Sequence, residues 1–106
     1  LRRHAMTMMA NTFDGLDAII GPNFAGGMLQ ITNYTGHPQL ALRSGFVDQP
    51  TRTIFGGVAD ESGATFSVPY ASSLWAPLFE EGTILALGTQ IEAVLGVADA
   101  RPEAFA

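Results

Sequence analysis

Residues 31–46 (ITNYTGHPQLALRSGF) constrain the fold more than any other part of the chain, because they combine a helix end, a turn and a strand start. Gly36 lies where a helix C-terminus favours a left-handed residue, so we expect it to adopt a positive φ. Pro38 follows two residues later and cannot continue the helix. The apolar run at 39–43 then predicts a short strand, which a Ser-Gly pair ends. One motif therefore connects a helix to a buried strand.

The rest of the chain alternates between helical and extended patterns. Helices are predicted at 4–12, 28–35 and 80–96, and strands at 17–20, 39–43 and 70–78. The order helix, strand, helix, strand, long excursion, strand, helix predicts an α/β fold with three or more strands. With 106 residues, the chain forms a single domain, 1–106, or a C-terminal subdomain of a larger protein.

The segment 80–96 carries the clearest helical pattern. Five apolar residues fall on one face and are expected to pack on the sheet. They are Ile84, Leu87, Ile91, Val94 and Leu95. Gly88 lies in the middle of this helix, where glycine costs about 1 kcal/mol relative to alanine. We therefore expect Gly88 to permit close packing against the sheet.

The segment 44–68 is the least regular part of the sequence. It is rich in Gly, Asp, Ser, Thr and Pro, and a hairpin turn is expected near 60–63. Structureless loops of this length are uncommon in compact domains. We therefore expect this excursion to be functional, bound to a partner, or more regular than its composition indicates.

Composition excludes several classes of protein. Apolar residues make up 47% of the chain and charged residues 14%, which argues against disorder. The net charge is −5 and all five basic residues are arginines that do not form a patch, so a nucleic-acid partner is not expected. No apolar run reaches the roughly 18 residues that a membrane span needs. The absence of cysteine excludes disulfides and thiolate chemistry, and with no signal-peptide pattern we expect a cytoplasmic protein.

Four motifs, in this order, resemble the C-terminal part of the amidase signature family. They are FDGLDAIIGP at 13–22, NYTGHP at 33–38, LFEEGTILAL at 78–87, and a tail with Arg-Pro at 101–102 and Phe105. The resemblance covers most of this chain but only the C-terminal part of a family member. It implies a layered α/β/α architecture with a small mixed sheet.

The resemblance also implies a hydrolase that acts on carboxylic amides or esters. Family members use a nucleophilic serine, activated through a second serine and a lysine, and these residues lie N-terminal to everything in this chain. The chain contains no lysine, so the family's catalytic set is absent from it. No cofactor is implied. A metal site is not expected either, because Asp14 and Asp17 lack further ligands at metal-binding spacing.

The residues themselves offer only weak catalytic candidates. Ser72 and Ser73 form the only Ser-Ser pair, but they fall in a predicted strand without the glycines of an oxyanion loop. Two strand-edge serines are the simpler interpretation. His37 could act as a base with Ser44 or Ser72 and a nearby aspartate. Its place in a turn is, however, explained by the turn alone.

Substrate-binding candidates follow from the resemblance. The loop 22–26 and the turn 33–37 correspond to the positions nearest a parent active site. Phe24, Asn33 and Tyr34 would line a substrate pocket there rather than perform chemistry. Core packing is an equally good interpretation of the two aromatic residues.

Three functional interpretations remain open from the sequence. The chain is a C-terminal piece of an amidase-type hydrolase, a free-standing small hydrolase that uses a serine and His37, or a non-enzymatic assembly module. Its high apolar and low charged content predicts a homo-oligomer, or association with the missing N-terminal part of an amidase. The substrate, the oligomer size, the catalytic competence of the isolated chain, and whether it is a natural protein, a processed chain or a gene fragment do not follow from the sequence.

Overall fold

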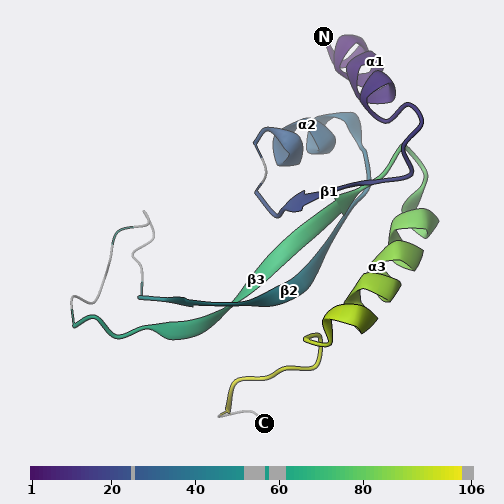
Figure 1. The fold of residues 1–106 in the computed structure, drawn as a ribbon. Coiled ribbons are helices and arrows are strands. Elements are labelled where there is room, and N and C mark those ends of the chain that lie inside the picture. Colours follow the sequence, from purple (N-terminus) through teal and green to yellow (C-terminus); the bar gives the residue numbers. More distant parts are fainter. Residues whose placement is uncertain (25, 52–56, 58–61, 104–106) are drawn as a thin grey trace.

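The computed structural model describes residues 1–24, 26–51, 57 and 62–103. These residues form three helices and three strands, shown in Figure 1. In chain order they are α1 (Arg2–Thr12), β1 (Ile19–Pro22), α2 (Met28–Thr35), β2 (Gln39–Gln49), β3 (Phe66–Trp75) and α3 (Glu81–Leu95). The order agrees with the predicted alternation of helices and strands, and the mixed α/β class is confirmed.

The three strands form an open sheet in the order β1-β3-β2. Both ladders within the described residues are antiparallel, so the mixed sheet implied by the resemblance is not found. The reason is connectivity: a parallel neighbour needs a crossover, whereas β2 and β3 follow one another as the two arms of a long hairpin. β1 pairs with the other edge of β3 and is antiparallel to it. It is an edge strand, where a proline such as Pro22 is tolerated.

The prediction of an irregular segment at 44–68 is wrong for both ends of that segment. β2 continues to Gln49 and β3 begins at Phe66, so the hairpin is much longer than the apolar runs indicate. A register shift between Arg43 and Gly45 marks a bulge, which interrupts the alternation that would reveal a long strand. β3 also ends three residues before the predicted limit at 78, since 76–79 form the turn before α3. The turn expected at 60–63 lies partly outside the described residues.

Glycine ends two of the helices, as the sequence indicates. Gly36 has a φ of 85° and donates its N–H to the Thr32 carbonyl oxygen at 2.8 Å. Gly96 has a φ of 66° and donates to the Glu92 carbonyl oxygen at 3.0 Å. Both left-handed residues satisfy a carbonyl that the helix end leaves without an intrahelical partner.

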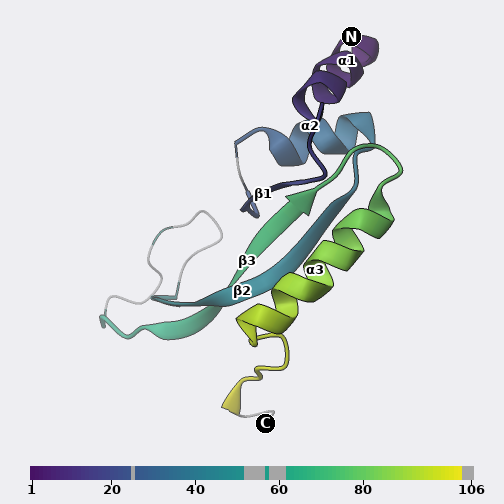
Figure 2. The same ribbon diagram turned by 45° about the vertical axis from the view of Figure 1, so that its right-hand side comes forward.

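Two apolar clusters form the core, one on each face of β3. Leu74 and Trp75 are neighbours in a strand and therefore point to opposite faces. The first cluster contains Leu42, Leu74, Ala76 and Ile84, with Ala18, Leu40, Leu87 and Ile91 packed around them. The second contains Met9, Phe13 and Trp75, with Ile19, Met28 and Ile31 around them. Thus α3 packs on one face and α2 lies on the other, while α1 lies beyond α2 and reaches the second cluster through Met9 (Figure 2).

The apolar face of α3 contacts the sheet over most of its length but not at its end. Ile84 is buried, and Leu87 and Ile91 join the first cluster. Val94 is 87% exposed, so the predicted five-residue core face is one turn too long. The close packing expected at Gly88 is confirmed, because a Cβ added there would overlap the side chain of Leu40.

The molecule is elongated. Its principal extents are 50 × 32 × 19 Å and its radius of gyration is 17.0 Å, against about 13 Å for a compact domain of this length. Much of the length comes from the outer half of the hairpin, residues 45–49 and 66–70, which we name the hairpin arm; it reaches beyond the helices (Figures 1 and 2). No helix in the described part of the chain is long and apolar enough to cross a membrane.

The close approach at Gly88 leads to a stability prediction. We expect Gly88→Ala to be less stable than Gly82→Ala, because both gain about 1 kcal/mol of helix propensity but only the methyl group at position 88 would displace the Leu40 side chain from its packing on α3. Gly82→Ala is the matched control: it lies in the same helix, and an added Cβ meets nothing within 4 Å. Denaturant unfolding should show the control equal to or above wild type. A Gly88→Ala protein as stable as the control would contradict the packing argument.

Candidate functional site

Ser44 and Ser72 form a hydroxyl pair between β2 and β3. The bulge leaves Ser44 as the extra residue of β2, and Ser72 Oγ donates to Ser44 Oγ at 3.0 Å. Ser44 Oγ in turn donates to the Tyr70 carbonyl oxygen at 3.2 Å. A nucleophilic serine needs a base within hydrogen-bond reach, and a backbone carbonyl cannot serve as one. The pair therefore links two strands at the bulge rather than forming a catalytic dyad.

Ser73 lies at the centre of the sheet and is fully buried. Its Oγ donates to Asn23 Oδ1 at 2.7 Å and accepts from Gln39 Nε2 at 2.9 Å. These partners lie on β2 and just after β1, so one hydroxyl joins all three strands. Ser72 and Ser73 are thus structural, as expected, although they lie on the central strand and not at a sheet edge.

His37 lies in the turn between α2 and β2 and is nearly buried. Its ring stacks on Phe13 with centroids 5.4 Å apart and planes 10° apart. Its Nδ1 is 2.6 Å from Thr35 Oγ1. Because the Thr35 hydroxyl is also placed to donate its single proton to the Ile31 carbonyl oxygen at 2.9 Å, we assign the proton between the two side chains to His37 Nδ1. The Nε2 nitrogen then carries the lone pair.

The chemistry of His37 is that of a neutral imidazole. Burial lowers the pKa of His37 from its ordinary value, because the low-dielectric surroundings disfavour the charged form. An unprotonated Nε2 is what a general base requires. Within the described residues, however, no hydrogen bond joins His37 to Ser44, Ser72 or Ser73. The structure therefore does not assemble the Ser-His pair.

The aromatic substrate-binding candidates are exposed. Phe24 is 79% exposed and Tyr34 is about half exposed, so the core-packing interpretation is wrong for both. Asn33 is exposed as well. The three residues lie after β1 and on α2, close to the second apolar cluster in sequence but outside it. Their predicted role as pocket walls remains a prediction.

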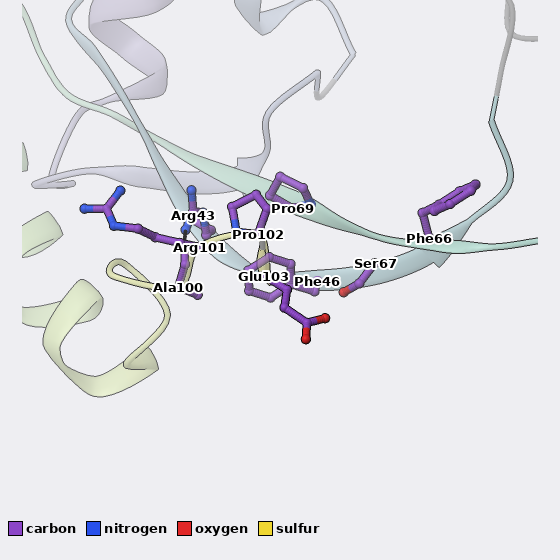
Figure 3. Close-up of a pocket in the computed structure, with 9 residues that line it drawn as sticks. All are labelled: Arg43, Phe46, Phe66, Ser67, Pro69, Ala100, Arg101, Pro102 and Glu103. Carbon is purple, nitrogen blue, oxygen red and sulfur yellow. Dashed lines mark hydrogen bonds between the residues drawn. The ribbon is translucent and has the colours of Figure 1, made fainter. Parts of the chain in front are cut away.

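A groove of about 610 Å³ lies between the hairpin and the C-terminal tail, as Figure 3 shows. Its lining residues are Arg43, Phe46, Phe66, Ser67, Pro69, Ala100, Arg101, Pro102 and Glu103. Aromatic and proline side chains make the walls largely apolar. Ser67 provides the hydroxyl group in this lining, and no imidazole accompanies it, so the groove is suited to binding rather than to acyl transfer.

Arg43 fixes one side of this groove. Its guanidinium donates to the Ala100 carbonyl oxygen at 2.6 Å, to that of Val97 at 3.3 Å and to that of Ala98 at 3.4 Å. It also lies 5.7 Å from the ring centroid of Phe46, within cation–π range. A cation beside the carbonyls that follow a helix end is favourable, so Arg43 ties the tail after α3 to β2.

Sequence reasoning missed both Arg43 and the network around Ser73. A signal for the first exists: Arg43 is the only Arg, Lys, Asp or Glu between 36 and 47, and a lone charge in an apolar strand needs partners. Asn23 carries no comparable signal, because its bond to Ser73 spans 50 residues of sequence. Over the described ranges, no group of three His, Asp or Glu residues is placed to hold a metal ion.

Comparison with known proteins adds no relative. The chain matches no family model, no curated protein and no solved structure. The functional argument therefore rests on the motifs of the sequence and on the geometry described above.

The lowered pKa of His37 leads to a prediction about pH. The imidazole titrates near about 6.5 in the unfolded chain and lower in the folded one, so the unfolded state binds the proton first as the pH falls. The contribution of neutral His37 to the free energy of unfolding is therefore fully present above about pH 6.5. It declines as the pH falls further, until the pH is below the pKa of His37 in the folded chain.

We expect the His37→Gln variant to lose less free energy of unfolding than wild type between about pH 7.5 and about pH 5.5, whatever its stability at either pH. His4→Gln is the control, because His4 is exposed. Denaturant unfolding at each pH measures the slope. If the slope of His37→Gln equals that of wild type, the histidine is not the group responsible.

Proposed function

We propose that this chain is the C-terminal segment of an amidase-type hydrolase that acts on carboxylic amides or esters, and that its catalytic Ser-Ser-Lys residues lie outside it. The order of the four motifs supports the family, and the packing of helices against both faces of the sheet supports a layered α/β/α arrangement. One observation carries the non-catalytic assignment: the hydroxyls of Ser44, Ser72 and Ser73 are all engaged in bonds between strands.

In this proposal the segment forms part of the substrate pocket but contributes no catalytic group. The exposed side chains of Phe24, Asn33 and Tyr34 would face the part of the enzyme that holds the nucleophile, and would line the pocket for a small amide or ester. The partner that completes the protein is then that upstream part, or a second copy of this chain. A cytoplasmic location is part of the same proposal.

An activity assay tests the catalytic part of the proposal. We expect the purified chain to hydrolyse a nitrophenyl ester or anilide no faster than buffer, and a fluorophosphonate probe to leave Ser72 and Ser73 unlabelled, because neither serine has a base. A known serine hydrolase in the same assay controls for the reagents. Stoichiometric labelling of either serine would show that the chain is a hydrolase in its own right.

The sequence of the flanking DNA tests the family assignment separately. An in-frame upstream segment with a lysine and a Gly-Ser-rich stretch would support it, and joining that segment to this chain should then produce amidase activity. A complete gene without such a segment would contradict the assignment.

A second candidate has one supporting observation. The unprotonated Nε2 of His37 is a base without a serine, so a free-standing oligomeric hydrolase could use it if another copy supplied the nucleophile. Loss of measurable esterase activity in His37→Gln, with the fold retained, would favour this candidate over the first. An inactive chain that assembles with itself would favour the third interpretation, an assembly module.

A further inference from the structure

Within the described part of the chain, one apolar face of the hairpin arm is exposed. Phe66, Val68 and Tyr70 alternate along β3 and therefore share a face, and Val47 joins them because it pairs with Val68 across the ladder. All four side chains are exposed, from 39% for Val68 to 55% for Phe66, and Phe66, at the end of the arm, also borders the groove described above. We name these four residues the arm face.

The arm face continues the side of the sheet that α3 covers. Ser72 and Leu74 follow Tyr70 on the same side of β3, and Leu74 is buried against α3. The apolar contacts of α3 end with Ile91, and the chain then turns into the tail that Arg43 holds. The same face of β3 is therefore buried near Leu74 and exposed from Phe66 to Tyr70.

The chain exposes more surface than a compact monomer of its mass. The accessible surface is 7538 Å², whereas a compact monomer of 11.2 kDa exposes roughly 5,700 Å². The excess of about 1,800 Å² exceeds the roughly 800 Å² that each partner buries in an interface of standard size. This surplus belongs to the whole elongated chain, and the exposed arm face contributes part of it.

The chemistry of the arm face indicates what covers it. Residues 62–79 contain no charged side chain, and Asp48 pairs with Ser67, which places it on the opposite side of the arm. Nothing on the face would attract a nucleic acid, a charged peptide or an anionic lipid surface. The surface that fits this face is therefore apolar and uncharged. A second copy of the chain offers such a surface, and the charged residues that give each copy its net charge of −5 would stay outside the contact.

Side chains rather than strand edges make this contact. Pro69 removes one N–H from the outer half of β3, and proline on an exposed edge is a common device against strand addition. A face, in contrast, is self-complementary about a twofold axis, which is the commonest symmetry of oligomers. We propose that the arm face is the interface through which two copies of this chain form a twofold dimer. This proposal goes beyond the amidase assignment and does not depend on it.

Sedimentation velocity over a micromolar concentration series tests the proposal. We expect a dimer for wild type, and an increase of at least about tenfold in the dissociation constant for Val68→Glu, since a charge would be buried at the centre of the contact. Val94→Glu is the matched control: it is equally apolar and more exposed, but it lies at the end of α3, and its dissociation constant should equal that of wild type. Circular dichroism reports whether each variant is folded.

A cysteine variant keeps the test decisive if Val68→Glu does not fold. The chain has no cysteine, so Val68→Cys carries a single thiol near the proposed axis, and Val94→Cys carries one away from it. Under mild oxidation, or with a short bis-maleimide, we expect Val68→Cys to form covalent dimers at least about tenfold faster than Val94→Cys, because linkage needs the two thiols close together.

Three results would overturn the proposal. The first is a wild-type chain that sediments as a monomer at every concentration. If that monomer also floats with neutral lipid vesicles, the arm face binds lipid instead. The second is a dimer that Val94→Glu weakens and Val68→Glu does not. The third is equal cross-linking of the two cysteine variants.

Discussion

The fold depends on apolar burial at two neighbouring residues of the central strand, Leu74 and Trp75, which anchor the clusters on its two faces. Trp75 is almost fully buried, and its indole N–H has no hydrogen-bond partner among the described residues. An unpaired buried donor costs about 1–3 kcal/mol. Burying about 150–250 Å² of aromatic surface contributes about 4–6 kcal/mol at the usual coefficient. Burial therefore outweighs the lost hydrogen bond and holds α1 and α2 to the sheet.

The turn after α2 sets how the strands meet at this anchor. The Pro38 carbonyl oxygen accepts the N–H of Ala76 at 3.2 Å, and the next residue, Gln39, pairs directly with Trp75. The turn after α2 thus places the start of β2 directly opposite the end of β3. His37 lies within the same turn and stacks on an aromatic ring at the end of α1. A single short motif therefore connects both halves of the core.

The sequence predicts those features whose cause is local. Glycine at a helix end and the apolar stripe of α3 depend on residues within a few positions of one another; both glycines have a positive φ, and the stripe packs on the sheet as far as Ile91. The close approach at Gly88 is indicated by a glycine inside a helix, although its contact, Leu40, lies 48 residues away in sequence. The long hairpin was missed because its pairing is non-local and the bulge at Ser44 breaks the alternation. The engagement of Ser73 and Arg43 was missed because their partners lie more than 30 residues away in sequence. The bonds that decide the roles of the candidate serines and of His37 form only in the folded chain.

The two halves of the hairpin differ in what stabilises them. The inner half has a third strand beside it, helices on both faces and a buried hydroxyl that joins all three strands. The outer half is a two-stranded ribbon, which by itself is only marginally stable in water. On one side it has the tail that Arg43 holds and the apolar walls of the groove. On its other side the described chain offers no cover, so the ribbon can contribute its apolar side chains to stability only by burying them against a surface from another molecule or another part of a longer chain.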